Sequence, residues 1–143
     1  MARYGNSITK TTGAAAAAIC TLGATASRDI RVFEVGVSLS TAVSGEVGIM
    51  RPGNTPGTPS GGQIGAPLDN VSGADTATLH NTWATTQPTA GTGMRRMVLP
   101  ATIGAGVIWT FPDGIVIPAS SYLMVWQYSA LAVTYSVYMH YDS

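Results

Sequence analysis

The chain has 143 residues, of which seven are basic and seven acidic, so its formal net charge is zero. This length predicts one domain with a real hydrophobic core. The charge balance argues against a nucleic-acid-binding face, and we interpret Arg95-Arg96, the only basic doublet, as a solvated strand end. Only 10% of the residues are charged, and so charge-poor a surface is typical of a subunit that lives in an assembly. The single cysteine, Cys20, rules out an internal disulfide and a cysteine metal site.

The chain begins with a polar stretch, residues 1–13, which we expect to form an N-terminal arm. An apolar run, AAAAAICTL, follows at residues 14–22. Its basic start, its apolar centre and the small residues Ala24-Thr25-Ala26 are the three parts of a signal peptide. The run is mostly alanine, however, and Thr21 interrupts it. We therefore expect the segment to remain on the mature protein.

The same run could be a helix or a strand. Alanine has the highest helix propensity, but a helix at residues 14–22 would be apolar all round and would need a fully buried position. Flanking threonines and the strand-like remainder of the chain favour a strand. One face of this strand would carry Ala14, Ala16, Ala18, Cys20 and Leu22.

Apolar residues recur at every second position in the rest of the chain, which predicts strands. The clearest case is residues 133–141, VTYSVYMHY, where Tyr138 is the one exception to the alternation. In residues 30–39 the apolar positions change phase once, so we expect a bulge near Val32-Phe33. Pro112-Asp113-Gly114 is expected to form a turn. Further strands are predicted at residues 46–50, 76–81, 96–99, 107–111, 115–117 and 122–128.

Residues 51–75 are rich in glycine and proline and nearly free of charge. A loop of this length in a compact domain is usually functional or disordered. It could be a flexible surface flap or a loop that a neighbouring subunit orders, and we expect the second. Short strands, frequent turns and the lack of a long amphipathic helix predict an all-β sandwich or barrel.

No motif in the sequence points to catalysis. There is no P-loop, no His-Glu-x-x-His and no Gly-x-Ser-x-Gly. His80 and His140 lie far apart and without metal-ligand spacing. We therefore expect no enzymatic activity, no cofactor and no metal. Trp83, Trp109 and Trp126 could form a sugar-binding platform, but packing in the core or in an interface is the simpler interpretation.

Residues 114–141 contain no charged side chain. Serines, Pro118 and Gln127 interrupt this stretch, so no apolar run approaches the roughly 20 residues that a spanning helix needs. We expect no membrane span.

Residues 95–128, RRMVLPATIGAGVIWTFPDGIVIPASSYLMVWQY, resemble small β-sandwich structural proteins of tailed bacteriophages. In those proteins a strand ending in Leu-Pro, here Val98-Leu99-Pro100, precedes a turn like Ile103 to Gly106. A strand with a tryptophan, a turn, a short apolar strand and a second strand with a tryptophan come next, here within residues 107–126. Residues 133–141 also look like the last strand of trimeric jelly rolls of the tumour-necrosis-factor and C1q shape.

The resemblance implies a single jelly-roll-like β-sandwich over residues 1–143, with long Gly- and Pro-rich loops and an N-terminal arm. It implies a capsid decoration (cement) protein, made in the host cytoplasm without a cleaved signal peptide and placed on the virion surface. The partner would be the major capsid protein of the phage shell, with no nucleic acid and no membrane involved. We expect contacts with the shell from the arm and from the long loop, through Arg3, Tyr4, Asn54, Pro56, Pro59 and Gln63.

A homotrimer is also expected, because a lone monomer would leave a charge-poor surface exposed. The expected interface between copies is one face of the last strand, formed by Tyr135, Val137, Met139 and Tyr141. The alternative function is a carbohydrate- or receptor-binding module of a phage tail or head fibre. Exposed tryptophans would favour that alternative, and buried tryptophans would favour the structural role.

Overall fold

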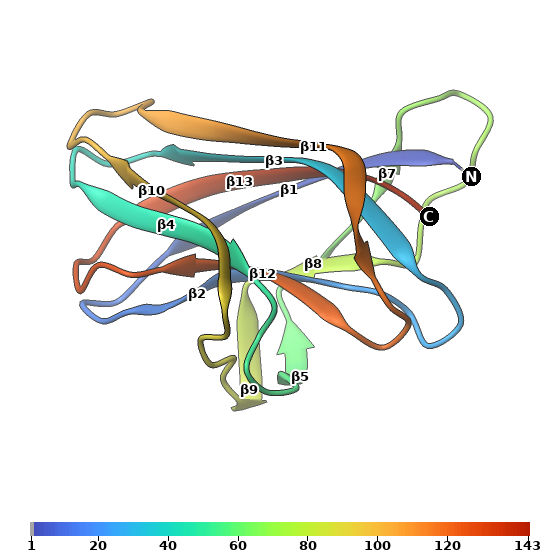
Figure 1. Ribbon diagram of the computed structural model, residues 1–143, viewed down its shortest axis with the longest axis horizontal. Coiled ribbons are helices and arrows are strands. Elements are labelled where there is room, and N and C mark those ends of the chain that lie inside the picture. Colours follow the sequence, from blue (N-terminus) through green and yellow to red (C-terminus); the bar gives the residue numbers. More distant parts are fainter. Residues whose placement is uncertain (1) are drawn as a thin grey trace.

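The computed structural model describes residues 2–143, and these residues form strands and loops without a helix. Two large antiparallel sheets pack face to face (Figure 1). The all-β sandwich predicted from the sequence is therefore confirmed. None of the described residues belongs to a helix long and apolar enough to cross a membrane.

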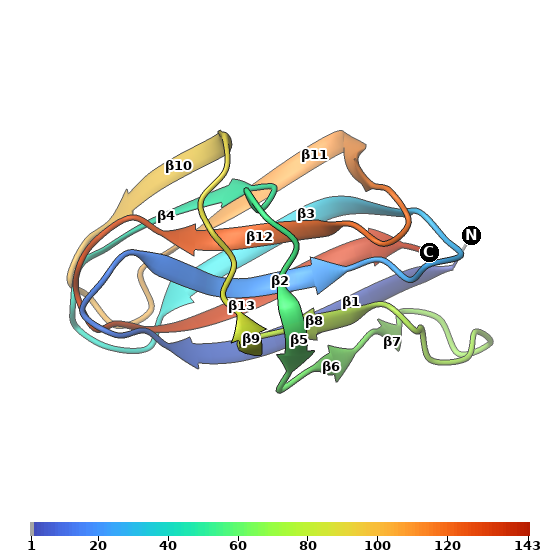
Figure 2. The same cartoon turned by 90° about the horizontal axis from the view of Figure 1, so that it is seen from below.

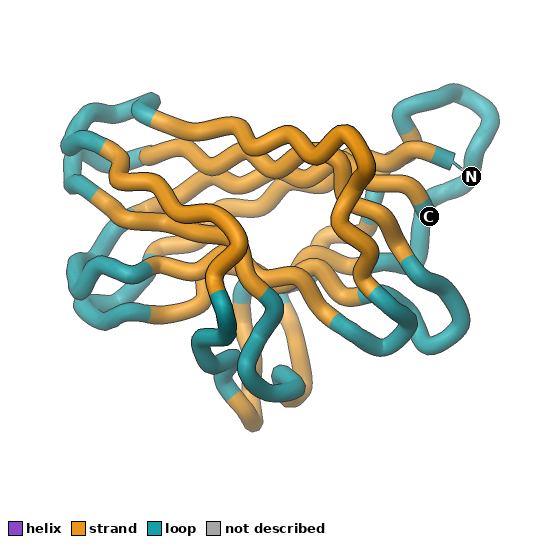
Figure 3. The backbone as a smooth tube through the Cα atoms, in the orientation of Figure 1, coloured by secondary structure: helices purple, strands orange, loops and turns teal. Residues whose placement is uncertain are grey.

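The strands form two large sheets and one small one, which Figure 3 separates from the loops by colour. The first sheet has the order β11 (Gly106–Ile117), β3 (Ile30–Leu39), β13 (Thr134–Asp142), β1 (Arg3–Thr11) and β7 (Ala66–Pro67). The second sheet has the order β10 (Gly93–Leu99), β4 (Gly45–Met50), β12 (Tyr122–Gln127), β2 (Ala17–Gly23), β8 (Thr78–His80) and β6 (Gln63–Ile64). The small sheet pairs β5 (Gly57–Ser60) with β9 (Thr82–Thr86).

The eight long strands have the connectivity of a jelly roll. In chain order they are β1, β2, β3, β4, β10, β11, β12 and β13, and they switch between the two sheets at every step except from β4 to β10. The resulting four-stranded halves, β11-β3-β13-β1 and β10-β4-β12-β2, are the two faces of a double Greek key. The strands β5 to β9 are additions in the connection between β4 and β10.

The N-terminal arm predicted for residues 1–13 is wrong. Residues 3–11 are strand β1, which pairs along its whole length with β13, from Arg3 opposite Asp142 to Thr11 opposite Thr134. Tyr4, Asn6 and Ile8 point into the core from β1. The polar residues between them lie on the outer face, so this stretch reads as polar although every second side chain is buried.

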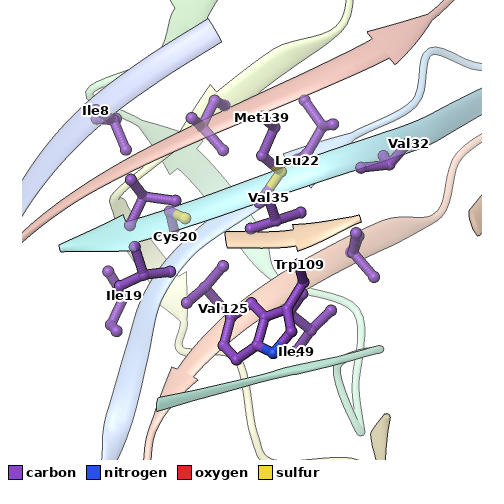
Figure 4. Packing of buried hydrophobic residues seen from close by; sticks show 14 of the residues in the cluster. Ile8, Ile19, Cys20, Leu22, Val32, Val35, Ile49, Trp109, Val125 and Met139 are labelled. Carbon is purple, nitrogen blue, oxygen red and sulfur yellow. The ribbon is translucent and has the colours of Figure 1, made fainter. Parts of the chain in front are cut away.

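The core lies between the two sheets, and Figure 4 shows residues of both sheets meeting there, among them Cys20, Trp109 and Met139. The strand predicted for residues 14–22 is confirmed, although it begins at Ala17. Both of its faces are covered, because Ala18 packs in a second apolar cluster outside the sandwich. Complete burial raises the pKa of the Cys20 thiol to about 12, so this cysteine is an inert core residue.

The bulge predicted near Val32-Phe33 is confirmed. Val35 lies opposite Met139 and Val32 opposite Tyr141, so β3 has one more residue than β13 between these pairs. The turn predicted at Pro112-Asp113-Gly114 does not reverse the chain.

Residues 106–117 form one strand, β11, along β3, with an irregularity between Thr110 and Ile115. Gly114 has φ +73°, which only glycine adopts readily, and Arg31 Nη1 donates a hydrogen bond to the Asp113 carbonyl at 2.8 Å. The two predicted strands at 107–111 and 115–117 are thus one strand with a bulge. The extra residues of β11 lie opposite the bulge of β3, so the two strands stay paired on either side of it.

Residues 51–75 are not a loop that a neighbour has to order. Within this segment β5 pairs with β9, β6 with β8, and β7 with β1. The backbone of these three strands is thus hydrogen-bonded inside the same chain, so their order does not require a second subunit. In Figure 2 the green strands β6, β7 and β8 lie along the edge formed by β1 and β2.

Candidate functional site

The four residues predicted to form the interface between copies lie in the core. Tyr135, Met139 and Tyr141 are 0% exposed and Val137 is 2% exposed. The prediction that these side chains contact another copy is wrong, because the second sheet of the same chain already covers them. An apolar face of a strand indicates that something covers it, but the sequence does not distinguish a second sheet from a second subunit.

The six residues predicted to contact a shell differ in exposure and in position. Tyr4 and Pro56 are buried, so neither side chain is free to contact a partner. Arg3 is exposed, with its guanidinium above the Phe33 ring and its Nε 3.2 Å from Asp142 Oδ1. Gln63 is exposed in β6.

Asn54 and Pro59 both belong to a part of the structure that stands away from the sandwich. We call this part the projection and define it as residues 51–60 together with residues 82–92, which include β5 and β9. In Figure 1 the two strands extend from the second sheet, below the rest of the molecule. Arg51, at its base, is the only charged residue of the projection.

Trp83 of β9 attaches the projection to the second sheet. Its side chain is only 5% exposed and packs with Ala18, Met50 and Met124 on the outer face of that sheet. Its Nε1 donates a hydrogen bond to Thr21 Oγ1 at 3.2 Å. Lys10 Nζ lies 5.8 Å from the ring centroid, and partial burial lowers the pKa of this amine. The attachment is a small apolar core of its own, so the projection has a fixed position on the sheet.

Hydrogen bonds also hold the two halves of the projection together. Asn54 Nδ2 donates to the Gln87 carbonyl at 3.0 Å, and Asn54 Oδ1 accepts from the Thr89 N–H at 2.9 Å. Hydroxyl pairs join β5 to β9: Thr58 to Thr85 at 3.0 Å and Ser60 to Thr82 at 2.8 Å. The projection therefore presents neutral hydroxyl and backbone groups on a braced support, an arrangement suited to packing on another protein surface.

A second feature is a hollow of about 520 Å³ on the outer face of the first sheet. Tyr138 lies at its margin and across Gly36, where any side chain would collide with the ring. The Tyr138 hydroxyl donates to Glu34 Oε1 at 2.8 Å, and His140 Nδ1 is 3.5 Å from the same oxygen. Desolvation, together with the bond to Glu34, raises the pKa of Tyr138 to about 12. Ser7, Thr9, Ser38, Gln63, Asn81 and Ser136 supply the polar lining.

Among residues 2–143, no three His, Cys, Asp or Glu side chains come close enough to hold a metal ion. His80 and His140 are half-buried and lie on different sheets. Trp83 and Trp109 are buried and Trp126 is half-buried, so the tryptophans form no exposed platform.

The sequence did not predict that residues 82–86 form a strand or that Tyr138 contributes to the hollow. Residues 82–86 lie just after a predicted strand in a Thr-rich stretch, which carried no apolar alternation. Tyr138 did leave a signal, since it is the one aromatic residue in the polar phase of 133–141. An aromatic residue in that phase of a half-buried strand lies on the outer face.

The geometry defines a jelly-roll β-sandwich with a projection whose one charged residue is Arg51. No family model matches the chain, and no curated protein or solved structure was found to be similar to it.

Proposed function

We propose that this protein is a non-enzymatic structural protein of a phage virion, which binds the outside of the assembled capsid as a decoration subunit and stabilises it. The observation that carries this proposal is the projection, which hydrogen bonds brace, which has a single charged residue and which stands away from the sandwich. The phage origin rests on the resemblance of residues 95–128 to phage virion proteins.

The chemistry of the projection supports a protein partner. Its exposed side chains are mostly those of threonine and serine, and Arg51 at the base is the one charged group among them. Such neutral side chains pack closely on another chain with little cost of burying charge. Because Trp83 and Asn54 hold it in place, little conformational entropy is lost on binding. A ligand that binds only the intact shell shifts the disassembly equilibrium, and the effect is repeated at many sites.

The test is co-sedimentation with shells assembled from the major capsid protein that is encoded alongside this chain. Thr55→Glu combined with Thr86→Glu places two charges on exposed positions of the projection. We expect this variant to lose most of its binding, because each charge would be desolvated in the contact. Ser27→Glu, in the exposed connection between β2 and β3, is the matched control and should bind as the wild type does. Failure of the wild type to sediment with the shells would overturn the proposal.

The hollow beside Tyr138 favours a second candidate, a carbohydrate- or receptor-binding module of a phage tail or head fibre. An aromatic ring next to hydroxyl and amide groups is a plausible surface for a sugar. The buried tryptophans count against it, since no exposed platform supplements Tyr138. A glycan array separates the two candidates: specific binding that Tyr138→Ala abolishes would favour the second.

A further inference from the structure

The strands β10 and β11 form one side of the sandwich, which we call the open side and define as residues 93–117. Each is the last strand of its sheet, since within residues 2–143 β10 pairs only with β4 and β11 only with β3. Arg95 of β10 reaches across to the Phe111 ring of β11, 5.7 Å from its centroid, so the two edges lie side by side. Figure 2 shows both strands along one margin of the molecule.

Exposed apolar side chains gather around these two edges. Ten large apolar residues of the described chain are exposed, and six of them lie between Met94 and Val116. Val98 is 65% exposed, Ile103 68% and Ile108 62%. Apolar surface next to unpaired backbone groups is a ready site for pairing with another strand.

The usual protection of an edge strand is weak here. Neither strand contains a lysine. Pro112 and the bulge protect part of the β11 edge, but residues 106–110 keep regular strand pairing with β3 and have no such protection. The two arginines of β10 are engaged within the chain: Arg95 on Phe111, and Arg96 on Tyr128 and with Glu46. Glu46 neutralises Arg96, so Arg95 is the one charged side chain of β10 without an ionic partner among residues 2–143.

The charges of the open side fit a second copy of the same chain. Among residues 2–143, neither the Arg95 guanidinium of β10 nor the Asp113 carboxylate of β11 forms an ion pair. A second copy brings one positive and one negative group to the same surface, so each has a complement across the contact. The net charge of zero also means that two copies do not repel each other at long range.

We propose that the open side is a self-association surface, at which residues 106–110 of one copy meet the open side of another. The pairing gives hydrogen-bond partners to backbone groups at the edge. It also covers Ile108, on the outer face of β11, and Met97, which points from β10 toward the gap between the sheets. This inference goes beyond shell binding and does not depend on it, because the projection is not part of the contact. The homotrimer expected from the sequence stays a prediction, since a two-fold pair and a closed ring both cover this surface.

The test is the mass of the purified full chain by light scattering over a dilution series. We expect the wild type to show a multiple of 14.7 kDa at the high end of the series and to dissociate on dilution. Ile108→Lys and, separately, Met97→Glu should weaken association by roughly tenfold or more, because each buries an unpaired charge. Val71→Lys is the matched control, since Val71 is exposed outside the open side.

Circular dichroism and thermal melting establish that each variant is folded before its mass is interpreted. A wild type that stays at 14.7 kDa throughout the series would overturn the proposal. So would folded Ile108→Lys and Met97→Glu variants that associate as strongly as the wild type. Shell binding by a monomeric wild type would overturn this inference alone and leave the proposed function standing.

Discussion

The two sides of the sandwich are built in opposite ways. On the side of β1 and β2, residues 61–80 add β7 to the first sheet and β8 and β6 to the second, and we call this the covered side. On the open side, β10 and β11 have no such addition. The long insertion between β4 and β10 thus protects one margin of the molecule and leaves the other free.

The difference shows what the Gly- and Pro-rich segment does for the fold. Edge strands expose backbone groups that pair readily with other chains, and a covering segment removes that hazard. Leu79 of β8 is fully buried and joins the main core, so the cover belongs to the folded domain. Because one edge is covered and the other is open and surrounded by apolar residues, a second chain can pair with this protein at the open side but not at the covered side.

The largest effect should come from removing a core side chain of the covered side. Leu79→Ala is expected to lower the free energy of unfolding by about 2–5 kcal/mol, because it leaves a cavity in the main core. Ile108→Ala on the open side should change it by no more than about 0.5 kcal/mol. Urea unfolding at low protein concentration measures both, and equal effects would remove the distinction between the two sides.

The next largest loss of stability is expected where the backbone of the covering segment packs closely against the core. A Cβ at Gly65 would collide with the hydroxyl of Tyr141, whose side chain is 0% exposed. Gly65→Ala should therefore cost about 1–3 kcal/mol in the free energy of unfolding. Gly73→Ala in the same segment is the control, because a Cβ there has no neighbour within 4 Å. Equal melting temperatures for the two variants would contradict the packing described.

The covered side should also weaken in alkali. Burial raises the pKa of Tyr141, and the nearby Asp75 carboxylate raises it further. Above the unfolded value of 10.0 the unfolded chain loses this proton while the native state keeps it, so stability falls as pH rises. Urea unfolding at about pH 8 and about pH 11 measures the fall, and Tyr141→Phe should reduce it. An equally steep fall in Tyr141→Phe would assign the effect to other groups.

The smallest effect is expected from an exposed ion pair on the open side. Arg96 donates a hydrogen bond to Glu46 and lowers the pKa of that carboxyl. This contribution is present above the unfolded pKa of 4.5 and is lost as pH falls through the lower folded value. Glu46→Gln should lower the melting temperature slightly at neutral pH and low salt, less than Gly65→Ala does. Added salt should erase the difference from wild type, and a deficit that persists in salt would contradict the screening of this pair.

Several features of the fold could be predicted because they depend on local sequence. The alternation of residues 30–39 and 133–141 located two central strands, and the change of phase at Val32-Phe33 located the bulge. Alternation reports which side chains share a face, and this holds wherever the strand lies in the molecule. Tyr138, the one exception to the alternation, lies on the outer face, but its contribution to the hollow was not predicted.

The predictions that were wrong all concerned partners distant in sequence. Residues 3–11 looked like an arm because their pairing partner lies at the other end of the chain. Pro112-Asp113-Gly114 was predicted to form a turn because the bulge in β3 that it faces is far away in sequence. The alternation of apolar and polar residues along a strand does not specify which strand pairs with it. It also does not specify which part of the molecule covers its apolar face.

The sequence by itself determined that the chain is all-β, that it is poor in charge and that it carries no catalytic motif. Only the tertiary structure decided that Tyr135, Val137, Met139 and Tyr141 face a second sheet and that residues 51–75 fold back on their own chain. The physical reason is that burial of an apolar face is favourable whatever covers it. Which surface covers the face depends on how distant strands pair, and that pairing also left β10 and β11 at the open side.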